Sequence, residues 1–184
     1  MHRQFILKLL EKYQTDDQKE RQMQYDLIQF VEQYENCFDR ELAVGHITGS
    51  AWLVNKELTH VFFTHHKKLD KWFQPGGHSD GNANTLAVAM NEASEESGIE
   101  DVFIQPLSDN IFDIDIHTIP ARKNELEHLH YDIRFILETD MSHPLNISDE
   151  SHEIAWIAIN DIPKYTTEES IQRMLKKMKS LKPN

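Results

Sequence analysis

The order of apolar patterns along the chain predicts an α/β or α+β fold. Residues 1–40 contain neither glycine nor proline and carry apolar residues at helical spacing. After residue 40 come short segments rich in Ile, Val, Phe and Trp, several of which alternate between apolar and polar residues, as strands do. One helical segment interrupts these strands and another ends the chain. Helices and strands in this order pack as layers around one hydrophobic core.

The N-terminal region is predicted to form two helical segments. Phe5, Leu9 and Leu10 share one face of the first segment, and residues 27–34 repeat this pattern in the second. The polar run 14–22 is either a connector between them or an exposed helix face. We therefore expect a helical region before the first strand.

Six segments are predicted to be strands, and one turn-rich loop separates the second from the third. The predicted strands are residues 44–54, 58–66, 101–107, 111–119, 129–138 and 153–159. The predicted loop is residues 75–82, PGGHSDGN, whose Gly, Pro, Asn and Asp residues favour turns. The final helix is expected to have Thr166 as its N-cap, with Glu169 as the partner in a capping box.

Composition favours a single soluble domain inside the cell. The chain has 184 residues, of which 39% are hydrophobic, enough for one core. The single cysteine, Cys37, excludes an internal disulfide and fits a reducing compartment, where we expect it to be a quiet buried thiol. Lys8 interrupts the first apolar run, so we expect neither a signal peptide nor a membrane span. The expected location is the cytoplasm.

The net charge of −12 limits the partners that the chain can bind. Extended nucleic acid requires a positive protein surface, so this class is disfavoured. A small phosphorylated molecule is compatible with the charge, because a bound metal ion reverses the local sign of the electrostatics. The sequence leaves open whether the chain is a monomer or a homodimer.

The segment 87–99, AVAMNEASEESGI, predicts a helix that ends in a cluster of acids. Glu92, Glu95 and Glu96 occupy one narrow arc of this helix, at spacings where like charges repel. They also lie near the negative pole of the helix dipole. A hard divalent cation such as Mg²⁺ or Mn²⁺, which prefers oxygen ligands, would relieve this repulsion. The alternative is an acidic face that is simply solvated.

A family resemblance favours the metal site. Residues 74–99, QPGGHSDGNANTLAVAMNEASEESGI, resemble the signature of the Nudix hydrolase family. That signature is a glycine, five residues, Glu, seven residues and then Arg-Glu-hydrophobic-x-Glu-Glu-x-Gly-hydrophobic. The matching residues are Gly77, Glu92, Ala93, Glu95, Glu96, Gly98 and Ile99. Ala83 and Asn91 stand where the family has its first Glu and its Arg.

The resemblance implies an α/β/α sandwich around a mixed β-sheet. It extends over roughly residues 40–165 and is similar to bacterial Nudix proteins with a helical N-terminal extension. We therefore expect residues 1–40 to be an extension packed on the core and residues 41–184 to be the Nudix domain, with the signature at 77–99. In the family the first Glu and the Arg are understood to pair. Their joint replacement by Ala83 and Asn91 removes this brace without leaving an unpaired charge.

The resemblance also implies metal-dependent hydrolysis of a diphosphate linkage in a nucleoside diphosphate derivative or a related small molecule. The implied cofactor is Mg²⁺ or Mn²⁺, and the implied metal ligands are Glu92, Glu95, Glu96 and the backbone carbonyl of Gly77. Glu92 is a ligand or the general base, and Glu95 is a main ligand that also counts as a catalytic candidate. Glu153, outside the signature, is a further catalytic candidate with Glu150 as its rival. The expected partner is a small phosphorylated substrate rather than extended nucleic acid or a membrane.

Further side chains are candidates for substrate contacts. His78 follows the double glycine and either faces a pocket or belongs to a turn. His128 and His130 point to one face of a predicted strand, where they bind zinc, contact the substrate or simply form a polar face. Lys71, with Lys67 and Lys68, either steers phosphates or is a solvated lysine. Three aromatic residues stack a base or, more simply, pack in the core: Trp72, Phe73 and Trp156.

Two other function classes are compatible with the same residues. The first is a Nudix-like binding or regulatory domain with little or no turnover, in which Ala83 and Asn91 mark the loss of activity. Retention of the three helix acids argues against it. The second is isomerisation of an isoprenoid diphosphate, which needs a protonating group such as a pocket cysteine. Cys37 precedes the predicted strands, which disfavours this class.

Overall fold

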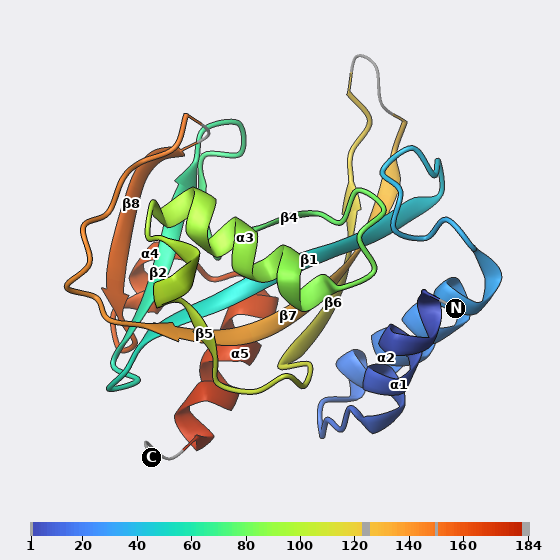
Figure 1. Cartoon of the computed structure of the whole chain (residues 1–184), viewed down its shortest axis with the longest axis horizontal. Coiled ribbons are helices and arrows are strands. Elements are labelled where there is room, and N and C mark those ends of the chain that lie inside the picture. The colour runs from blue at the N-terminus through green and yellow to red at the C-terminus, as the bar shows by residue number, and fades with distance from the viewer. Residues whose placement is uncertain (1, 123–125, 150, 182–184) are drawn as a thin grey trace. The chain divides into compact units, whose positions relative to one another are not determined.

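The computed structural model describes residues 2–122, 126–149 and 151–181 (Figure 1). The chain forms two compact units. Unit 1 contains residues 1–50, 76–89 and 109–135, and unit 2 contains residues 51–75, 90–108 and 136–184. Two strands and one helix run through both units, so the division follows packing rather than chain order.

In the part of the chain that the structure describes, two helices come first, a helical segment separates two groups of four strands, and two helices come last. The helices are α1 (Arg3–Lys12), α2 (Gln18–Gln33), α3 (Thr85–Ser97), the short 3₁₀ helix η1 (Asp101–Phe103), α4 (Ile162–Tyr165) and α5 (Glu169–Ser180). The strands are β1 (Gly45–Asn55), β2 (His60–His66), β3 (Lys71–Phe73), β4 (Gly76–His78), β5 (Gln105–Pro106), β6 (Asp113–Ile119), β7 (His128–Thr139) and β8 (Ser151–Ala158). Within the described residues, no helix combines the length and the apolar character that a membrane span needs.

The sheet of unit 1 is built from β1, β4, β6 and β7. β4 pairs antiparallel with β1, β6 pairs antiparallel with β7, and β1 and β7 are neighbours. The colour order in Figure 1 shows that β1 and β7 run in the same direction, so the sheet is mixed. Gly76 lies opposite Ser50, where an added Cβ would come within 2.1 Å of the Ser50 hydroxyl oxygen. Only glycine allows β4 to approach β1 this closely.

The N-terminal helices belong to unit 1, and α2 packs on β6. α1 and α2 lie side by side (Figure 1). The fully buried carboxylate of Glu20, in the first turn of α2, accepts hydrogen bonds from the hydroxyls of Tyr13 and Thr15 and from the backbone N–H of Ile114 at 3.0 Å. A buried carboxylate is stable only with such donors. Glu20 therefore ties the helical region to the sheet.

Unit 2 is organised around β2. This strand pairs with β1, β3 and β8, while β5 pairs with the end of β7. Trp52 is fully buried, packs edge-to-face on Phe63 and donates its indole N–H to the sulfur of Met178 at 3.2 Å. Met178 lies on the apolar face of α5, which covers this core. The other buried residues of that face are Ile171, Met174 and Leu175.

Several predicted elements differ from the structure. Residues 101–107 form η1 and the two-residue strand β5 instead of one long strand. The predicted loop 75–82 contains the strand β4. Thr166 is not the N-cap of α5, because the helix begins at Glu169 after Glu168, and no side chain caps it. The short elements β3 and α4 were not predicted.

The main predictions on fold are confirmed. The chain is an α/β protein with a mixed sheet and an N-terminal helical region. The polar run 14–22 contains both a connector and a helix start, because Asp17 caps α2 by accepting from the backbone N–H of Glu20 at 3.0 Å. The domain boundary at residues 40 and 41 stays a prediction.

Candidate functional site

The acidic helix α3 has well-defined ends. The side chain of Asn84 accepts from the backbone N–H of Ala87 at 3.2 Å, so Asn84 acts as the N-cap. At the other end Gly98 adopts a left-handed conformation with φ of 73° and donates its backbone N–H to the carbonyl of Ser94 at 2.8 Å. The backbone N–H of Asn146 donates to the carbonyl of Ser97 at 2.9 Å. These donors partly neutralise the negative end of the helix, beside which the acids lie.

The three acids of α3 differ in exposure. Glu92 and Glu96, one turn apart, are half-buried, whereas Glu95 is exposed. In the described part of the chain their carboxylate oxygens do not form a group within 4.8 Å of one another. Like charges three and four residues apart on a helix repel one another. A cation would have to draw the side chains together.

The positions at which the chain departs from the family signature carry no charge. Ala83 is half-buried in the segment before α3, and Asn91 is exposed on the helix. Since both are neutral, neither leaves a buried charge in need of a partner.

Glu153 lies on β8 with an exposed side chain and pairs in register with His65 of β2. The His65 ring stacks on Trp72 of β3, with centroids 5.1 Å apart and planes 9° from parallel. Trp72 also meets Tyr165 edge-to-face at 5.3 Å. Glu150, the rival of Glu153, lies outside the described residues.

Two of the three lysines near the predicted loop, Lys67 and Lys71, already have acceptors for their ammonium groups. The ammonium of Lys71 is 2.5 Å from a carboxylate oxygen of Glu168. Lys67 donates to the backbone carbonyl of Asp149 at 2.8 Å. Trp156 packs edge-to-face on the buried Phe62 at 5.7 Å, which agrees with the core-packing interpretation.

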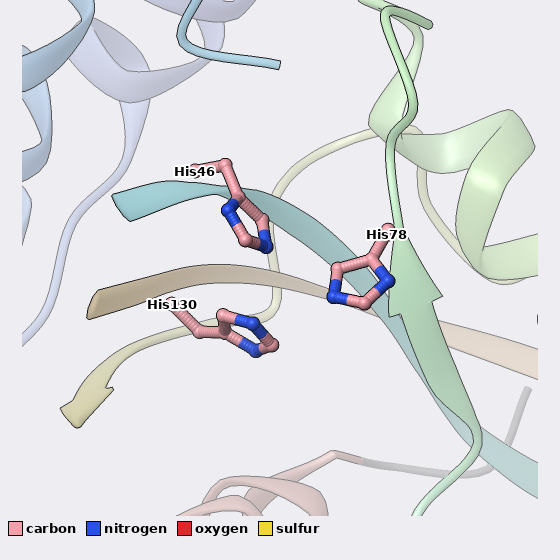
Figure 2. Close-up of side chains that lie close together, drawn as sticks. All are labelled: His46, His78 and His130. Carbon is pink, nitrogen blue, oxygen red and sulfur yellow. The ribbon is translucent and has the colours of Figure 1, made fainter. Parts of the chain in front are cut away.

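A cluster of histidines lies on one side of the unit 1 sheet. Figure 2 shows the rings of His46, His78 and His130 pointing toward one another from β1, β4 and β7. The ring centroids are 4.9 Å apart for His46 and His78, 4.7 Å for His46 and His130, and 5.1 Å for His78 and His130. His117 and His128 extend the cluster, 5.5 Å and 5.3 Å from the ring of His130.

The two most buried rings of this cluster have lowered pKa values. Burial and the neighbouring histidines lower the pKa of His46 to about 4 and that of His130 to about 2. Both imidazoles are therefore neutral at pH 7. The His46 side chain is only 2% exposed, and neither of its ring nitrogens has a hydrogen-bond partner in the described structure.

An ionic network continues along the same strands. The guanidinium of the buried Arg134 contacts three carboxylates, those of Asp132 at 2.7 Å and of Asp113 and Asp115 at 3.3 Å each. Burial opposes the charge on Arg134, but the carboxylates outweigh it and raise its pKa. Asp132 also accepts from the hydroxyls of Thr48 and Ser50 at 2.8 and 2.7 Å.

Sequence reasoning identified two of the three central histidines and missed the third. His78 and His130 were singled out, and the structure brings them together; His78 lies in a strand rather than a turn. His46 and the Arg134 network were missed. The available signal was alternation, because His46, Thr48 and Ser50 fall on one face of β1.

Comparisons with known proteins identify the family of the chain and solved structures with a similar fold. Residues 46–178 match the family model described as NUDIX domain. The structure is similar to a Caenorhabditis elegans Ap4A hydrolase (TM-score 0.59, 14% identity, 73% of this chain and 95% of that one). It is also similar to a Nudix-family hydrolase from Clostridium perfringens (TM-score 0.54, 22% identity, 74% and 98%). At these identities the similarity concerns the fold. A comparison with curated protein sequences finds no match.

Proposed function

Because the chain belongs to the Nudix family of pyrophosphohydrolases, we propose that it cleaves a diphosphate linkage in a nucleoside diphosphate derivative or a related small molecule, with Mg²⁺ or Mn²⁺ as cofactor. The observation that carries this proposal is the family match over residues 46–178, which includes the whole of α3. The single cysteine supports a reducing compartment, and we propose the cytoplasm.

The side chains of α3 fit a hard divalent cation. Glu92, Glu95 and Glu96 supply the carboxylate oxygens that Mg²⁺ and Mn²⁺ prefer. Glu92 and Glu96 are half-buried, so their charges are partly desolvated and a cation would stabilise them. We propose these three as metal ligands, and the Gly77 carbonyl as a further ligand on the resemblance alone. When bound, the metal offsets phosphate charge and lowers the pKa of a coordinated water.

Glu92 and Glu153 are the two candidates for the general base. The base must take a proton from the attacking water at a carboxylate oxygen, which requires an ionised side chain within reach of that water. Glu153 is exposed and has no proposed metal-binding role, whereas Glu92 has to combine this role with metal binding. Hydrolysis rates of the Glu92→Gln and Glu153→Gln variants, each measured as a function of pH, would show which residue is the base. Only removal of the base should abolish the fall in rate at low pH.

Lys71 is our candidate for attracting the phosphates of the substrate. Its ammonium is held by Glu168, so binding of a phosphate requires exchange of one anion for another. This exchange is feasible because both side chains are more than 40% exposed and such surface ion pairs contribute little stability. For His78 and His130, which were predicted to contact the substrate, the cluster geometry favours a different role.

A hydrolysis screen of nucleoside diphosphate derivatives with Mg²⁺ and Mn²⁺ tests the proposal. We expect turnover of at least one compound by the unmodified chain and a loss of about a hundredfold or more in the Glu95→Gln/Glu96→Gln variant. Glu100→Gln, an exposed acid just beyond the helix, is the matched control and should retain full activity. Equal rates for the unmodified chain and the double variant would refute the assignment of these acids.

The replacement of the Glu–Arg pair by Ala83 and Asn91 favours a second candidate, a binding or regulatory domain with little turnover. The same screen distinguishes the two functions. Metal binding to the α3 acids without hydrolysis of any compound would support the second candidate.

A further inference from the structure

The histidine cluster of unit 1 has the composition and spacing of a metal site, and its residues are not those of the acidic helix. Each of His46, His78 and His130 offers one ring nitrogen within 4.8 Å of the other two. Among the described residues, no other group of three His, Cys, Asp or Glu side chains brings its ligand atoms this close together. We propose that these three histidines bind a borderline divalent metal ion, Zn²⁺ in the first instance.

The strands hold the three rings close to a binding geometry. His78 is paired with Thr48, and His46 lies two residues before Thr48 on the same face of β1. His130 is paired with His117 on β6, and β7 is the neighbour of β1. Zn–N bonds of about 2.0–2.1 Å place ligand nitrogens about 3.4 Å apart in a tetrahedral site. The three ring nitrogens lie within 4.8 Å of one another, at most about 1.4 Å beyond this spacing.

Two of the three rings, those of His46 and His130, have buried nitrogens without a partner in the described structure. Both nitrogens of His46 and the Nε2 of His130 are buried without a hydrogen-bond partner in the described part of the chain. A buried polar atom without a partner is costly, and most such atoms in folded proteins have one. A metal ion would accept a lone pair from each of the three rings. It would thus satisfy one nitrogen on each ring at once.

The donor set selects the class of metal. Three imidazole nitrogens, with no carboxylate or thiolate in the group, suit Zn²⁺, Co²⁺, Ni²⁺ or Cu²⁺ rather than Mg²⁺ or Mn²⁺. Three protein ligands leave a fourth position for water or another small ligand. His117 is fixed beside the cluster through the contact of its Nδ1 with Asp115 at 3.1 Å. The proposal does not depend on the hydrolase activity.

Titration of the metal-stripped full chain with Zn²⁺ and Co²⁺ tests the proposal. The Glu95→Gln/Glu96→Gln variant serves as the starting protein, so that binding at the α3 acids is suppressed. We expect one saturable Zn²⁺ equivalent and a visible Co²⁺ spectrum typical of four-coordinate nitrogen ligation. His78→Asn in this background should weaken Zn²⁺ binding by at least about a hundredfold. Loss of a group that only supports a ligand already lowers metal affinity about 10- to 100-fold, and loss of a ligand itself should cost more.

His152→Asn is the matched control, since His152 is an exposed histidine outside the cluster. It should leave Zn²⁺ affinity unchanged. X-ray absorption of the zinc-loaded unmodified chain provides a test that needs no variant to fold, and we expect it to count three imidazole ligands. Absence of saturable binding, equal affinity of the His78→Asn variant, or a zinc shell with fewer than three imidazoles would each overturn the proposal.

Discussion

Arg134→Met is expected to destabilise the fold more than any surface substitution. The Arg134 side chain is 4% exposed and is the cation that balances the carboxylates of Asp132, Asp113 and Asp115. Removal of one partner from a buried ion pair costs about 3–5 kcal/mol, because it leaves uncompensated charge in a low-dielectric environment. For a chain of this length, that corresponds to a fall of about 6–20 °C in the unfolding midpoint.

Thermal and urea unfolding followed by circular dichroism would measure this effect. Arg40→Met is the matched control, because Arg40 forms an ion pair with Asp80 in which both side chains are about half exposed. A surface pair of this kind contributes at most about 1 kcal/mol. If Arg134→Met costs no more free energy of unfolding than Arg40→Met, the network does not stabilise the sheet as we argue.

The pH dependence of the Arg134→Met variant gives an independent check. Without the cation, the buried carboxylates leave uncompensated negative charge in the folded state. Protons that bind these carboxylates at low pH remove this charge and with it part of the destabilisation. The stability gap between the unmodified chain and the variant should therefore narrow as the pH falls from 7 toward 4. A gap that is constant over this range would contradict the explanation.

Three further substitutions or treatments test other parts of the structure. Glu20→Gln should cost about 1–3 kcal/mol and speed hydrogen exchange in α2, because a buried charged acceptor is lost; unchanged exchange would contradict the anchoring role. Gly76→Ala should lower the free energy of unfolding by about 1–3 kcal/mol, since its Cβ would overlap Ser50, and a neutral result in urea unfolding would argue against that close approach. Burial raises the pKa of Cys37 to about 11, so at pH 8 the folded chain should react with a thiol reagent far more slowly than the unfolded chain. Rapid labelling of the folded chain would show that this thiol is accessible.

The elements that were predicted correctly are those in which a helical or alternating pattern continues over many residues. Helical spacing over residues 3–33 and alternation over β1, β2 and β7 extend far enough to be read without knowledge of the partners. The strands that the sequence did not predict are short. β3 and β4 have three residues each, and they exist because they pair with β2 and β1. No local pattern can encode such pairing: Pro75 and the two glycines after it favour a turn, yet Gly76 and Gly77 form β4.

The same distinction explains which site residues were found. The acids of α3 lie within one helix, so their spacing alone places them together. His46, His78 and His130 come from three strands that meet only through strand pairing. His46 looked like an ordinary polar residue at the start of a strand until pairing brought it beside the other two. A site assembled across a sheet can be read from the sequence only once its register is known.

The polar face of the unit 1 sheet carries an ionic network and a histidine cluster at different positions along the same strands. Toward the carboxyl end of β7, Asp132 contacts the guanidinium of Arg134 and accepts from Thr48 and Ser50, so both charged groups have partners. Toward the amino end, His130 is neutral and its Nε2 has no partner among the described residues. A satisfied buried network is rigid and fixes the register of the strands that carry it. The Arg134 network therefore holds the histidines in place for a ligand, and Arg134→Met should weaken Zn²⁺ binding although Arg134 is not one of the proposed ligands. Zinc titration of the folded variant would measure this coupling, and an unchanged affinity would show that the histidines are positioned independently of the network.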